Sequence, residues 1–92
     1  MTDEVTPAEL PQVDFSNFVL SLAATAMVQL GMVPDPETGE NAAPNLPIVK
    51  HTLETLAMLR EKTRGNLDDE EEKLLDSMLY ELRMRFVEAG KS

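Results

Sequence analysis

The chain of 92 residues contains no cysteine and no tryptophan, and it has one histidine, one tyrosine and three phenylalanines. Without cysteine it can form no disulfide and offers no thiolate ligand to a metal. So few aromatic side chains cannot form the stacking platforms that hold single-stranded nucleic acid. No glutamate has a histidine three residues later, which excludes the Glu-x-x-His pairs of di-iron helical bundles.

Basic residues are absent from the first half of the chain. Residues 1–49 hold seven acidic residues and no lysine or arginine, whereas all eight basic residues lie from Lys50 onward, beside ten acidic ones. The formal net charge is −9. Because an acidic protein repels phosphate backbones, we expect no nucleic-acid partner.

Charge of either sign is absent from the 20 residues between Phe15 and Pro34. We expect a helix over about residues 15–30, with Asp14 as its N-cap and with Gly31 at its end. Its polar residues recur every fourth position as one uncharged stripe: Asn17, Ser21, Thr25 and Gln29. A surface helix would carry lysine and glutamate there, so we expect this helix to be covered on nearly all sides.

A membrane is the alternative cover for this uncharged run. Twenty residues reach the lower range for a spanning helix, but Gly31 and Pro34 shorten it, and both flanks are acidic, with Asp14 and Asp35. Spanning helices usually have a basic cytoplasmic flank. We therefore do not expect a spanning helix, and peripheral association with a membrane through residues 15–34 remains an alternative. The acidic start of the chain differs from a secretory signal, so we expect a cytoplasmic protein.

Two further helices are predicted after a linker over residues 32–45, which contains a turn at Pro36–Gly39. The second spans about 46–64, with Asn45 as its cap and basic residues suited to the helix dipole at its end. The third spans about 69–89, with a capping box of Asp68 and Glu71 and with Gly90 as its end. The connection between them is short enough to make an antiparallel hairpin. We predict an all-α three-helix bundle over residues 14–90, preceded by a disordered acidic arm over 1–13.

The third helix carries a second, smaller apolar stripe opposite its main one, made of Tyr80, Met84 and Val87. A three-helix monomer buries one face of each helix, so this stripe and the uncharged first helix predict self-association, as a dimer. The residues that we expect at the interface between copies are Phe15, Phe18, Leu22, Ala26, Met27, Tyr80, Met84 and Val87.

Four segments of the chain carry a recognisable pattern: Phe15–Leu22, Gly31–Glu40, Leu56–Leu67 and Leu79–Val87. Over about residues 14–88 this pattern resembles the domain of unknown function 1844 family of small bacterial proteins. The proline-rich stretch Asn41–Pro47 departs from the pattern of the family. The resemblance implies a helical domain without known catalytic residues, so it assigns no site to this chain.

Motifs of catalysis are missing as well. The chain has no HExxH, no glycine-rich phosphate loop and no recognisable nucleophile setting, and His51 faces away from the apolar side of its helix. Asp35, Glu37 and Glu40 do not match the spacing of an EF-hand. We expect no enzyme activity, cofactor or metal, and a function in protein–protein contact. An alternative is an adaptor that presents the arm 1–13 and the linker 32–45 to an unidentified larger protein.

Overall fold

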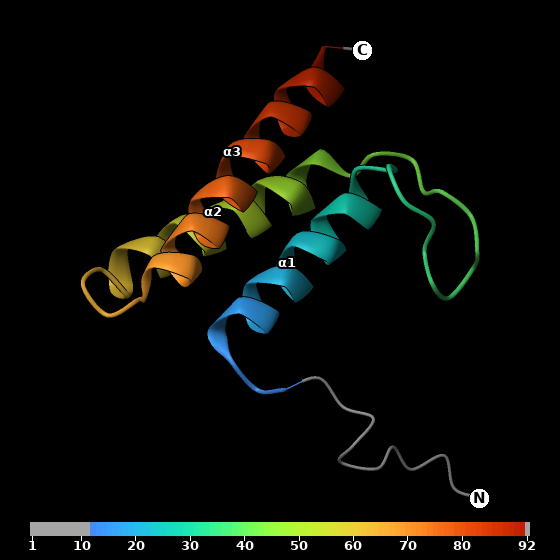
Figure 1. Cartoon of the computed structure of the whole chain (residues 1–92). Coiled ribbons are helices and arrows are strands. Elements are labelled where there is room, and N and C mark those ends of the chain that lie inside the picture. The colour runs from blue at the N-terminus through green and yellow to red at the C-terminus, as the bar shows by residue number, and fades with distance from the viewer. Residues whose placement is uncertain (1–11, 92) are drawn as a thin grey trace, which may run out of the picture.

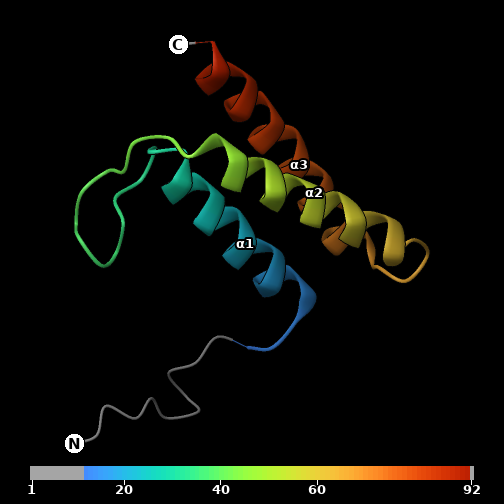
Figure 2. The same ribbon diagram turned by 180° about the vertical axis from the view of Figure 1, so that it is seen from behind.

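The computed structural model describes residues 12–91 and contains three helices. These are α1 (Phe15–Gln29), α2 (Leu46–Lys62) and α3 (Asp69–Gly90), and each contacts the other two. Helices α2 and α3 form an antiparallel hairpin, and α1 packs against it (Figures 1 and 2). The predicted all-α fold is therefore confirmed, with no strand among the described residues. The predicted arm 1–13 lies outside the described residues except for Gln12 and Val13.

Each helix begins at the predicted cap. Asp14 and Asn45 accept hydrogen bonds from backbone N–H groups in the first turns of α1 and α2. At α3 the Asp68 carboxylate accepts from the N–H of Glu71 (2.8 Å), and the Glu71 carboxylate accepts from the N–H of Asp68 (3.0 Å). This reciprocal pair is the predicted capping box, and it satisfies two N–H groups that the helix itself leaves without partners.

Helices α1 and α2 are each followed by a glycine in a left-handed turn, and α2 ends at Lys62, two residues before its predicted end. Gly31 (φ 79°) and Gly65 (φ 83°) adopt the left-handed conformation that a side chain disfavours. Gly90 does not adopt this conformation, although it is the last residue of α3, as predicted for the end of the third helix. Helix α3 includes Gly90 and has Lys91 as its C-cap. A side chain at Gly90 would approach Leu46, so this glycine lies where α3 passes the start of α2.

The core lies where the three helices meet. Helix α1 and its C-cap contribute one narrow face with a spacing of four, three and four residues: Val19, Ala23, Ala26 and Leu30. The small side chains of Ala23 and Ala26 let the hairpin come close. The fully or nearly fully buried apolar residues are Val19, Ala23, Ala26, Leu30, Val49, Leu53, Leu56, Leu75, Leu79 and Leu82. Helix α1 therefore packs on the hairpin of its own chain.

The loop between α1 and α2 is tied back to the end of α1. The N–H of Asn45 donates to the carbonyl of Gln29 (2.8 Å), and the side-chain amide of Asn41 donates to the carbonyl of Gly31 (2.8 Å). The predicted turn is present inside the loop, where the N–H of Gly39 donates to the carbonyl of Asp35 (2.7 Å). These bonds fix the start of α2 beside the end of α1.

Candidate interaction surface

An apolar stripe on the outer side of α3 remains uncovered by the rest of the bundle. Tyr80, Met84 and Val87 are 66%, 44% and 54% exposed. They lie on the face of α3 that points away from its buried residues Leu75 and Leu82. The structure thus brings these three predicted interface residues together on one surface of a single helix.

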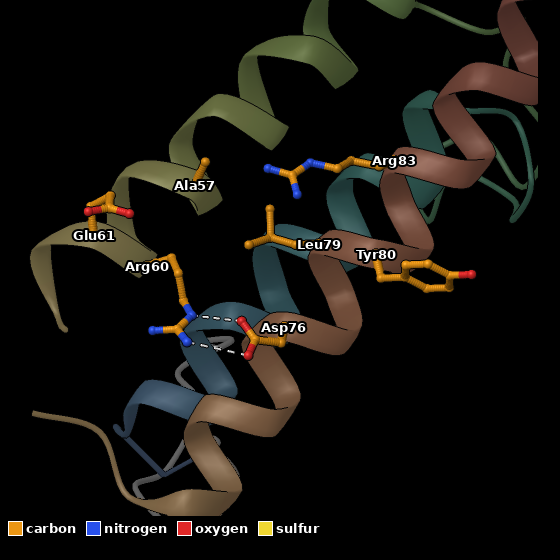
Figure 3. A pocket seen from close by; sticks show the side chains of 7 residues that line it. All are labelled: Ala57, Arg60, Glu61, Asp76, Leu79, Tyr80 and Arg83. Carbon is orange, nitrogen blue, oxygen red and sulfur yellow. Dashed lines mark hydrogen bonds and ion pairs between the residues drawn. The ribbon is translucent and has the colours of Figure 1, made fainter. Parts of the chain in front are cut away.

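A groove between α2 and α3 borders this stripe (Figure 3). It encloses about 330 Å³ and is lined by Ala57, Arg60, Glu61, Asp76, Leu79, Tyr80 and Arg83. In Figure 3 the side chain of Arg83 extends toward α2, whereas the ring of Tyr80 points away from it. The small side chain of Ala57 leaves space between α2 and α3, and this space forms the groove. The hydrophobic pattern of the sequence did not predict a groove at this place.

Ion pairs cross one end of the groove. The guanidinium of Arg60 donates to Asp76 (Nε to Oδ1, 2.7 Å) and to Glu72 (Nη2 to Oε2, 2.8 Å). The hydrogen bond to Asp76, with the charges of both carboxylates, raises the pKa of Arg60 above its ordinary value. Arg60 therefore bridges α2 to α3, in addition to lying in the last turn of α2, where a positive charge suits the helix dipole as expected.

A second depression of about 410 Å³ continues the groove along α3. Its lining residues are Tyr80, Arg83, Met84, Val87, Glu88 and Lys91. The two depressions share Tyr80 and Arg83, so they form one continuous surface. Within residues 12–91 Arg83 has no ion-pair partner. This surface is apolar at its centre and carries an unpaired positive charge at its edge.

The interface residues predicted on α1 divide into two groups. Phe15, Leu22 and Met27 are partly buried against the chain's own core, and Ala26 has no exposed surface. Phe18 is 49% exposed and lines neither of the depressions described above. Among the five interface residues predicted on α1, Phe18 therefore has the most exposed side chain.

The outer face of α1 is free of charge. Leu20 is 45% exposed there, and Ser21, Ala24 and Thr25 are exposed as well. The Ser21 hydroxyl donates to the carbonyl of Phe18 (2.8 Å), and the Thr25 hydroxyl donates to that of Ser21 (3.1 Å). Both hydroxyl groups are thus already bonded to the helix, so this face needs no external partner for them.

Neither a metal-binding cluster nor a membrane-spanning helix is present in the described part of the chain. His51 is exposed, as the sequence predicted. Between Gln12 and Lys91 no cluster of three histidine or acidic side chains is arranged to hold a metal ion. Over the same residues no helix has both the length and the apolar content needed to cross a bilayer.

Comparison with known proteins gives one match. The family model described as "Domain of unknown function (DUF1844)" matches residues 12–88, which includes all of α1 and α2 and most of α3. Neither the curated proteins nor the solved structures contain a match to the chain.

Proposed function

The chain belongs to the domain of unknown function family 1844, and we propose that it is a non-catalytic helical module that binds protein, beginning with a second copy of itself. The observation that carries this proposal is the surface of α3, where Tyr80, Met84 and Val87 stay exposed after the three helices have packed. Single exposed apolar residues are common, but a contiguous apolar patch is typical of a binding surface.

The composition of this surface supports contact with protein. Tyrosine and methionine are enriched at protein interfaces, because both offer a large contact area and methionine adapts its shape. The patch is flanked by charged groups, including Arg83 and Glu88, in the manner of an apolar centre with a polar rim. A small domain also gains burial by association that its own core cannot supply.

The chemistry of the groove supports a role without catalysis. Two of its charged residues, Arg60 and Asp76, are bonded to each other. Since an arginine with a raised pKa keeps its proton at ordinary pH, Arg60 is a poor general base. The ion pair instead stabilises the contact between α2 and α3 beside the exposed stripe.

The mass of the protein in solution tests this proposal. Light scattering on a sizing column, with loading from about 100 µM down to about 1 µM, covers the range of moderate dimer affinities. We expect a dimer mass at high concentration that falls toward the monomer mass on dilution. A monomer mass throughout would contradict self-association.

The outer face of α1 favours a second candidate function, peripheral binding to a membrane. Phe18 and Leu20 are exposed on two different flanks of α1, whose own residues carry no charge, and Asp35 and Glu37 of the following loop line a depression beside Ala24 and Thr25. The acidic residues Asp14 and Asp35 near the two ends of α1 oppose contact with anionic lipid, so neutral vesicles are the appropriate probe. Cosedimentation with neutral vesicles that is lost in Phe18→Asp would support this function. No cosedimentation of the wild-type protein would exclude it for neutral lipid.

A further inference from the structure

The exposed stripe of α3 has the spacing of a coiled-coil seam. Its residues follow one another at intervals of four, three, four, three and four positions. All are exposed: Lys73, Ser77, Tyr80, Met84, Val87 and Lys91. A repeat of 3.5 residues keeps a stripe in contact with a second helix that lies alongside. Helix α3 therefore has two faces, one packed inside its own bundle and one with the pattern of a helix-to-helix contact.

The exposed area of the stripe approaches that of a specific interface when the residues at its two ends are included. Lys73 and Lys91 are 18 positions apart, which corresponds to about 27 Å along a helix. The exposed parts of Tyr80, Met84 and Val87 amount to roughly 300 Å², since large side chains offer about 150–250 Å² each. The aliphatic stems of the two lysines and of Arg83 extend this area toward the roughly 500 Å² per partner that a specific interface needs.

Charges beside the stripe indicate which helix would pair with it. Arg83 lies on one flank without an ion-pair partner in the described chain, and Glu81 and Glu88 lie on the other flank. The contact of Glu88 with Arg85 is long, at 4.0 Å. In a parallel pair of helices, a residue on one flank meets the residue five positions later on the partner's opposite flank. Arg83 would then meet Glu88 of a second copy, and the twofold symmetry would repeat this pair. The same register places Asp76 opposite Glu81 of the second copy, but each of these carboxylates already has an arginine partner in its own chain.

An antiparallel arrangement lacks this match. It places the same flanks of two copies side by side, so that Glu81 and Glu88 of one copy meet the same acidic residues of the other. Helix α1 lies behind the groove in the view of Figure 3, so it stays out of a contact made at the stripe, whereas α2 borders that contact through the groove.

Building on the proposed self-association, we propose that the occupant of the stripe is α3 of a second copy, parallel and in register. The twofold axis runs between the two helices and parallel to them, so each residue of the seam meets its own counterpart. The two lysines at the ends of the seam also face their counterparts, and their long stems let the charges turn to solvent. Tyr80, Met84 and Val87 then form successive apolar layers between the two helices. Arg83 of each copy pairs with Glu88 of the other at the rim.

Exchange of these two charges tests the pairing. Arg83→Glu and Glu88→Arg each place like charges side by side at both rims, so we expect each variant to dimerise about tenfold more weakly or worse in sedimentation equilibrium. The double variant Arg83→Glu/Glu88→Arg restores opposite charges, and we expect its affinity to return close to that of wild type. Lys62→Glu is the matched control, because it changes the net charge as Arg83→Glu does at an exposed site on α2.

The outcomes separate this inference from the broader proposal. A wild-type protein that dimerises, with single variants that dimerise equally well or a double variant that is not rescued, would overturn the pairing of α3 and leave self-association intact. A wild-type protein that remains a monomer would overturn both. Unchanged far-UV circular dichroism in all variants shows that the exposed substitutions leave the fold in place.

Discussion

Replacement of Gly31 by alanine tests how the loop after α1 is held. Gly31 has a φ of 79°, in the left-handed region, where a residue with a side chain costs about 1–2 kcal/mol. A Cβ atom at this position would also stand far too close to the carbonyl oxygen of Ala42, which belongs to the backbone and cannot rotate away. The loop would have to shift.

The shift has a further energetic cost. It would strain the bond from the amide of Asn41 to the carbonyl of Gly31 and the bond from Asn45 to Gln29, and a lost hydrogen bond costs about 1 kcal/mol. The expected loss for Gly31→Ala is therefore about 2–4 kcal/mol in the free energy of unfolding. A domain of this size has a total stability near the low end of about 5–15 kcal/mol, so the effect is large.

Gly65→Ala is the matched control. Gly65 has nearly the same backbone conformation, with φ 83°, but no heavy atom lies within 4 Å of the position of its Cβ. The expected loss is the conformational cost alone, about 1–2 kcal/mol. Urea denaturation followed by circular dichroism at one protein concentration measures both. Equal losses for the two variants would refute the close approach of the loop to Gly31.

Three other substitutions test the bundle by the same denaturation assay. Leu56→Ala removes a fully buried side chain from α2 and should cost about 2–5 kcal/mol, and a loss below about 1 kcal/mol would argue against its place in the core. Asp68→Ala removes the capping box of α3 and should cost about 1 kcal/mol, more than Asp69→Ala in the same turn. Leu22→Asp places a charge against the core and should cost about 3 kcal/mol or more, so a urea midpoint like that of wild type would contradict the packing of α1.

The sequence was sufficient for the elements that depend on local signals. The caps at Asp14, Asn45 and Asp68 mark the starts of the three helices because each side chain bonds to N–H groups only a few residues away. The outer stripe of α3 was also predictable. Apolar side chains interrupt a face that otherwise carries charge, so Tyr80, Met84 and Val87 stand out.

The orientation of α1 was not predictable, because no charge marks its outer face. Phe18 and Leu22 are both large apolar residues in an uncharged helix, so the sequence does not tell which of them faces the core. In the structure Leu22 packs against the core and Phe18 is largely exposed. The inner face is built on Val19 and small alanines, whose fit depends on the shape of the hairpin. The bridge from Arg60 to Asp76 was missed for a similar reason, since it joins residues 16 positions apart on different helices.

Disulfide formation by a single introduced cysteine tests most directly whether two copies meet at α3. The natural chain contains no cysteine, so the background is zero. Met84→Cys lies at the proposed twofold axis, whereas Leu20→Cys is comparably exposed on the outer face of α1. Under mild oxidation we expect rapid covalent dimers of Met84→Cys and slow formation for Leu20→Cys. Equal rates, or faster formation for Leu20→Cys, would contradict the account.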